Sequence, residues 1–168
     1  MQSDDRRDEV DELVASWRRE RPDLPAEPLE VLSRVNRVAQ RLDEGRRTAF
    51  AAHDLQLWEF DVLAELRRSG DPYQLSPGHL SKQNRVTSGT MTNRVDRLAA
   101  RGLVGRHTDP SDGRGVIVRL TPAGRDLVDA ALADLLAWEE RQLAALGADD
   151  RSALAALLRR LLLAVVEA

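Results

Sequence analysis

The chain has 168 residues, a formal net charge of −3 and no cysteine. Its length suits one domain, and its 42% hydrophobic and 32% charged residues are typical of a folded rather than a disordered protein. The lack of cysteine excludes disulfides and thiolate zinc sites and fits a cytoplasmic location, and neither a membrane span nor a secretory signal is expected from the hydropathy pattern.

The first 70 residues predict three helices. In residues 4–20, apolar side chains recur three or four positions apart, which favours a helix; they are Val10, Leu13, Val14 and Trp17. A second helix is expected from Pro28 to Ala51, because proline is tolerated in a first turn. A third is expected after Asp54, a candidate N-cap, and ends at Gly70.

In the middle of the chain, the sequence pattern changes from one typical of helices to one typical of strands. Ser76 is expected to cap a short helix, and Thr87 or Ser88 the next one, which ends at Gly102. Two short runs rich in Val, Leu, Ile and Thr follow, GLVGRHT and GVIVRLT, separated by the turn-forming DPSDGRG. This pattern predicts a β-hairpin.

Two helices are expected in the last third of the chain. The first follows the Thr121-Pro122 pair and runs to about Gly147, and the second starts at Asp149 or Asp150. The last helix has a wide apolar stripe formed by Leu154, Leu157, Leu158, Leu161, Leu162 and Val165. Such a stripe is consistent with a dimer core.

The charge is unevenly distributed along the chain. Residues 73–121 carry eight basic and three acidic side chains, a net charge of +5, between acidic segments of −5 (residues 1–72) and −3 (residues 122–168). A basic middle segment favours a polyanionic partner, although a solvated charged surface has the same composition.

A short helix, a turn, a second helix and a hairpin follow one another in the order of a winged helix-turn-helix. Met91, Val95 and Leu98 are spaced to anchor the second helix to a core. Its polar sides then carry candidate DNA-binding residues, together with two basic residues before the helix; these are Lys82, Arg85, Ser88, Thr90, Thr92, Asn93 and Arg97. Small hydroxyl side chains allow close approach to the DNA backbone, and Asn and Arg can make bidentate base contacts in the major groove.

The hairpin tip adds a further candidate DNA contact. Arg114 lies between glycines, where it can enter a narrow minor groove. An ordinary exposed polar helix face is the simplest alternative for the second helix alone. The combination of helix, hairpin, tip arginine and local charge favours binding of double-stranded DNA.

The run from LSKQNRV to VRLTPAGRDLV resembles the MarR family of transcriptional regulators, through SGTMTNRVDRL, GLV, DPSDGRG and VRLTPAG. The resemblance implies a mainly α fold with a small β-hairpin wing, and a homodimer that binds a pseudo-palindromic operator and is released by a small ligand. It implies a salt bridge from Asp112 that positions Arg114. Residues 1–168 then form one domain, with an extra N-terminal helix (1–25), dimerisation helices (26–54 and 122–168) and a DNA-binding lobe (55–121).

The N-terminal helix with its WRRERPDL segment looks like the urate-responsive, PecS-like subclass of this family. That resemblance implies a ligand pocket formed by Trp17, Asp61 and Arg94. Trp17 can stack on a flat purine, and Arg94 can pair with its anionic edge. An incoming anion would repel Asp61 and compete for Arg94, so that the recognition helix would shift.

Other roles for these three residues stay open. Trp17 can pack a helix against the core, Asp61 can pair with Arg68, and Arg94 can contact phosphate. Because Asn93 and Arg94 are adjacent, the sequence does not decide which of them reads DNA.

The competing functions are weaker. An enzyme is not expected, because His53, His79 and His107 lie on different elements and no metal spacing, phosphate-binding loop or nucleophile elbow occurs. No cofactor is expected. A helical dimerisation module without DNA binding is a second alternative, but it gives the predicted wing no role. Within the regulators, a response to phenolic or drug-like aromatic compounds is the alternative to urate, and activation is an alternative to repression.

Overall fold

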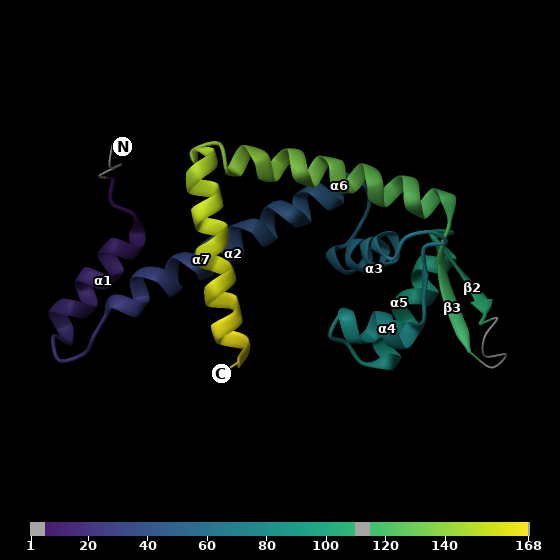
Figure 1. The fold of residues 1–168 in the computed structure, drawn as a ribbon, viewed down its shortest axis with the longest axis horizontal. Helices are drawn as coiled ribbons and strands as arrows, with labels where there is room; N and C mark the ends of the chain where they lie inside the picture. The colour runs from purple at the N-terminus through teal and green to yellow at the C-terminus, as the bar shows by residue number, and fades with distance from the viewer. Residues whose placement is uncertain (1–5, 110–114, 168) are drawn as a thin grey trace. The chain divides into compact units, whose positions relative to one another are not determined.

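The computed structural model describes residues 6–109 and 115–167, which divide into two compact units, residues 1–47 and 48–168. The chain is mostly helical and carries one small antiparallel sheet (Figure 1). The predicted fold class, mainly α with a hairpin wing, is confirmed. The elements are α1 (Glu9–Glu20), α2 (Glu27–Ala51), α3 (Leu57–Arg68), β1 (Gln74–Leu75), α4 (Pro77–Gln83), α5 (Ser88–Ala100), β2 (Val104–Thr108), β3 (Val116–Leu120), α6 (Pro122–Gln142) and α7 (Ala148–Glu167).

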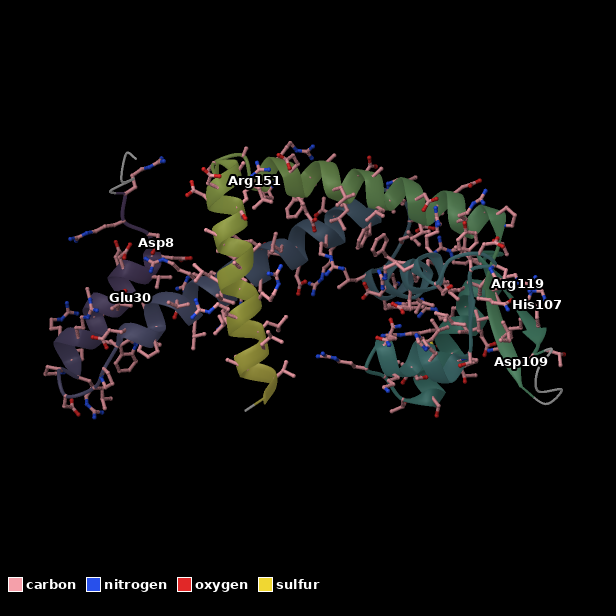
Figure 2. The ribbon with its side chains drawn as sticks, in the orientation of Figure 1. Asp8, Glu30, His107, Asp109, Arg119 and Arg151 are labelled. Carbon is pink, nitrogen blue, oxygen red and sulfur yellow. The ribbon has the colours of Figure 1, made fainter. Side chains whose placement is uncertain are left out.

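The first unit joins α1 to the N-terminal part of α2. Its apolar cluster is small, with Val10, Val14 and Ala26 buried. Charged contacts supplement it: the guanidinium of Arg34 on α2 donates to Asp8, the N-cap of α1, and to Asp11 in its first turn, at 2.8–3.0 Å. Figure 2 shows Asp8 at the start of α1. The first unit therefore depends on ion pairs as well as on apolar burial.

These contacts predict an acid-sensitive attachment of α1. The hydrogen bonds from Arg34 lower the pKa of the Asp8 carboxyl from 3.8 to about 2. A lowered pKa contributes stability that is fully present above pH 3.8 and is lost as the pH falls through about 2. We expect the Asp8 carboxyl to titrate near pH 2 by NMR, and Asp8→Asn to remove this part of the acid dependence of α1. A titration midpoint near 3.8 would contradict the ion pair.

The second unit has one main core, formed by α3, α4, α5, the sheet and α6. The end of α2 contributes Phe50, whose ring stacks on that of Phe60 in α3 with centroids 4.0 Å apart. Val62, Leu63 and Leu66 of α3 are fully buried in this core. Because α3 buries six of its twelve residues, it packs against several elements of this core, namely α4, β3 and α6.

Several predicted helix ends are confirmed, since capping is a local interaction. The side chains of Ser76, Thr87 and Thr121 cap α4, α5 and α6. Gly102, which follows the α5 C-cap, has a φ of 70°, a conformation that favours glycine.

Several predicted boundaries are wrong. The first helix is expected over residues 4–20, but α1 begins at Glu9, after its N-cap Asp8. Asp54 is not an N-cap, because its backbone has a φ of 52° and α3 begins after Gln56. The α6 helix ends at Gln142 instead of Gly147, and α7 begins at Ala148 rather than at an aspartate. Figure 2 shows Arg151 at the start of α7, where its guanidinium donates to carbonyl oxygens of the α6–α7 connection and pairs with the Glu140 carboxylate at 2.7 Å.

The sheet has the strand order β1–β3–β2 and is antiparallel throughout. The two long strands are those of the predicted hairpin, and the Asp109 amide closes it by donating to the Gly115 carbonyl at 2.9 Å. The strand β1 was not predicted, because two residues carry no periodicity. Arg119 of β3 fixes it by donating to the Gln74 side chain at 2.6 and 2.9 Å.

Most of the apolar stripe of α7 is exposed. Its exposed members are Leu154, Leu157, Leu158, Leu162 and Val165, whereas Leu161 is half-buried. Leu163 and Val166, outside the stripe, are exposed as well. Among the residues that the structure describes, no helix combines the length and apolar character that a membrane crossing needs.

Candidate nucleic-acid interface and effector residues

The α5 helix has one buried and one exposed side, as its sequence predicted. Met91, Val95 and Leu98 are fully buried in the core of the second unit. The helix follows the short α4 after a turn at Arg85, which has a φ of 51°. These three anchors fix the rotation of α5, so its polar side faces solvent.

The predicted DNA-binding residues that the structure describes are exposed. They are Lys82 on α4, Arg85 in the turn, and Ser88, Thr90, Thr92, Asn93 and Arg97 on α5. Two of the hydroxyls already have local partners: Thr90 Oγ1 lies 2.9 Å from Thr87 Oγ1, and Thr92 donates to the Ser88 carbonyl at 2.9 Å. Asn93 is exposed and its neighbour Arg94 is half-buried.

The wing contacts α5 through a pair that was not predicted. Arg106 of β2 lies 2.7 Å from the Asp96 carboxylate and donates to the Thr92 carbonyl at 3.3 Å. The predicted pair of Asp112 and Arg114 lies outside the described residues. Figure 2 shows His107 on β2, Asp109 directly after it and Arg119 on β3.

The N-terminus of α3 contacts the arginines of α5. Glu59 is 3% exposed, and its carboxylate lies 2.9 Å from Arg101, which caps the C-terminus of α5. The guanidinium carbons of Arg94 and Arg97 lie 5.3 and 4.9 Å from the ring centroid of Trp58. Sequence reasoning missed these roles of Trp58 and Glu59. The sequence offered one indication of such a partner, the spacing of Arg94, Arg97 and Arg101, which places the three arginines on one face of the helix.

A cleft of about 450 Å³ borders this arginine pair. It is lined by Trp58, Gly89, Thr90, Asn93, Arg94 and Arg97. Its lining includes two guanidinium groups, an amide and a hydroxyl, so it is suited to anions and to hydrogen-bonding partners.

The three predicted effector residues lie in different units. Asp61 and Arg94 are half-buried in the second unit. Trp17, in the first unit, is 51% exposed and lines a mostly apolar pocket of about 370 Å³ with Leu24 and Pro25. The Arg68 guanidinium pairs with Glu65, one turn before it on α3.

Among the described residues, no group of three histidine, aspartate or glutamate side chains is arranged to hold a metal ion. Every buried side-chain nitrogen or oxygen in the same part of the chain has a hydrogen-bond partner.

The chain is similar to MarR-family regulators both in sequence and in structure. Residues 53–115 match the model of the MarR family. The HTH-type transcriptional regulator PecS of Dickeya dadantii is 35% identical over 152 residues, which are 90% of this chain and 92% of PecS.

Two solved structures are similar in fold. A mutant form of MarR from E. coli, complexed with operator DNA, has a TM-score of 0.66 and 28% identity, covering 81% of this chain and 96% of that one. The second is BpsR of Bordetella bronchiseptica, whose DNA binding is regulated by 6-hydroxynicotinic acid. It has a TM-score of 0.65 and 29% identity, covering 78% of this chain and 91% of BpsR. The chain is thus a regulator and not an enzyme, and it belongs to the MarR family of transcriptional regulators.

Proposed function

We propose that the protein binds a double-stranded DNA operator by inserting α5 into the major groove. The observation that carries the proposal is the two-sided character of α5, with three fully buried anchors and an exposed row of polar residues. Such a helix can approach base edges without losing its packing. Asn93 is the better candidate for reading bases, because it is exposed and Arg94 lies against Trp58.

The protein acts as a homodimer on a pseudo-palindromic site. The exposed apolar side chains of α7 support this, because a monomer would leave a row of leucines and valines in water. Two copies of α5 then contact half-sites about one helical turn apart. Binding to DNA is consistent with the cytoplasmic location expected from the sequence.

The test is a binding titration with the DNA upstream of the protein's own gene. We expect this duplex to bind more tightly than a random duplex of equal length, with an affinity that falls steeply as salt rises, because arginines displace counterions from phosphates. Asn93→Ala should reduce the preference, whereas Arg125→Ala, an exposed change on α6, should leave it unchanged. Equal affinities for both duplexes across the salt series would contradict the proposal.

We further propose that urate or a similar purine anion weakens the DNA complex, so that the protein is a repressor released by its ligand. Trp17 supplies an exposed aromatic face beside an apolar pocket, and Arg94 supplies a cation on the helix that reads DNA. An anion that pairs with Arg94 and is repelled by Asp61 would change the position of α5. The effector would thereby act on the reading helix itself.

The effector is tested by titrating urate into the wild type and into Trp17→Ala and Asp61→Asn, with calorimetry and a gel shift. Urate should weaken DNA binding by about 5- to 150-fold, and DNA should weaken urate binding by the same factor. Trp17→Ala should lose urate affinity, and Asp61→Asn should keep the affinity but lose much of the response. Unchanged DNA affinity at saturating urate would contradict this assignment.

The second candidate is a response to phenolic or drug-like aromatic compounds. It is favoured by the cleft beside Arg94 and Arg97, whose guanidinium groups can pair with an aromatic anion, and by the regulation of DNA binding of BpsR by 6-hydroxynicotinic acid. Release of DNA by a phenolic acid, with no effect of urate, would select it.

A further inference from the structure

Three arginines of one α5 face contact the beginning of α3 and the residues before it. Arg94 and Arg97 of α5 and its C-cap residue Arg101 follow each other at intervals of three and four residues, so they lie on one side of the helix. The first two lie over the ring of Trp58, and the third pairs with Glu59 at 2.9 Å and with Asp54 at 3.3 Å. One short segment, residues 54–59, therefore contacts every arginine of this face.

The Trp58 ring is itself held in place. Its indole nitrogen donates to the side-chain oxygen of Gln56, and the backbone N–H of Gln56 donates to the Glu59 carboxylate at 2.8 Å. The ring also packs, partly buried, against the core of the second unit. A ring fixed at its polar edge and along its apolar side can present only a defined face to the two guanidinium groups.

We propose that Trp58 is a positioning residue for DNA binding, which holds Arg94 and Arg97 in a defined geometry before DNA arrives. The inference rests on the proposed function of α5 as the reading helix. An indole face attracts guanidinium groups more strongly than any other side-chain ring. Two long side chains that are ordered in advance lose less conformational freedom on binding, so the complex is tighter and more selective.

The experiment compares Trp58→Leu, which keeps an apolar side chain but removes the aromatic face, with Trp58→Phe, which keeps a ring. Trp138→Phe, a partly buried tryptophan on α6, is the matched control. Each variant is titrated with the upstream duplex and a random duplex over a salt series, and its thermal unfolding is measured. The order of the Arg94 and Arg97 side chains is measured by NMR without DNA.

We expect Trp58→Leu to weaken binding to the upstream duplex roughly tenfold and to reduce its preference over random DNA. The salt dependence should stay near that of the wild type, because no charge is removed. Both arginine side chains should become more mobile, and Trp58→Phe should recover most of the affinity. Arg97→Ala, in contrast, should reduce the salt dependence.

A merely structural role of Trp58 predicts lower thermal stability with unchanged arginine order and unchanged DNA preference, and this result overturns the inference. Equal behaviour of Trp58→Leu and Trp138→Phe also overturns it. A wild type with no preference for the upstream duplex is a failure of the proposed function instead. The arginine order in Trp58→Leu then still decides whether the ring positions these side chains.

Discussion

Gly124→Ala is expected to destabilise the second unit by about 3 kcal/mol or more, because a methyl group at this position has no space. A Cβ built on Gly124 would lie 2.1 Å from the Leu103 carbonyl oxygen and 3.0 Å from a methyl carbon of Leu120. The first contact is with backbone, so no side-chain rotation can relieve it, and overpacking of a core commonly costs about 1–3 kcal/mol even where side chains can move.

The Leu103 carbonyl cannot move easily either. It accepts a hydrogen bond from the Thr121 backbone amide at 3.1 Å, and it shares the Thr121 hydroxyl proton with the Gly102 carbonyl, at 3.0 and 2.8 Å from the hydroxyl oxygen. The same hydroxyl accepts from the Gly124 amide and so caps α6. A shift of Leu103 would therefore disturb the start of α6 and the connection between α5 and the wing together.

Gly89→Ala is the matched control for this prediction. Gly89 lies in α5 with nothing within 4 Å of a built Cβ. Alanine is favoured over glycine in helices by up to about 1 kcal/mol, so this variant should be neutral or slightly stabilised. Urea unfolding of both variants measures the difference. Equal stabilities would show that the chain around Gly124 adapts to a side chain.

Arg101→Ala should cost about 2–3 kcal/mol, the second large effect. The Glu59 side chain is only 4% exposed, and without Arg101 its carboxylate would keep the backbone N–H of Gln56 as a hydrogen-bond donor. Removing one member of a buried ion pair commonly costs about 3–5 kcal/mol, and the value is reduced here because the Arg101 side chain is 31% exposed. DNA binding should also weaken, because the pair of Arg101 with Glu59 joins the C-terminal end of the reading helix to α3.

Two controls separate this effect from the simple loss of an arginine. Arg125→Ala removes an exposed arginine whose carboxylate partner, Asp126, lies 3.8 Å away, and should change stability by less than about 0.5 kcal/mol. Glu59→Gln leaves Arg101 with solvent and Asp54, so it should cost less than Arg101→Ala. A loss in Arg101→Ala no larger than in Arg125→Ala would show that the buried pair contributes little.

The sequence predicted the elements of the DNA-binding lobe because their signals are local. A capping hydroxyl acts within three residues, and the anchors of α5 recur within two turns. The error at Asp54 has a physical cause as well. A good N-cap residue type stood near the start of α3, but two further residues were needed to turn the chain before the helix could begin.

The sequence by itself determined the order of helices and hairpin, the rotation of α5 and the resemblance that the MarR family match confirms. Only the tertiary structure decided which charged and aromatic groups meet. The pairs of Arg106 with Asp96 and of Arg101 with Glu59, and the stacking of two arginines on Trp58, join residues 10 to 42 positions apart. Such contacts depend on how helices and strands pack, and neither residue type nor local spacing specifies them.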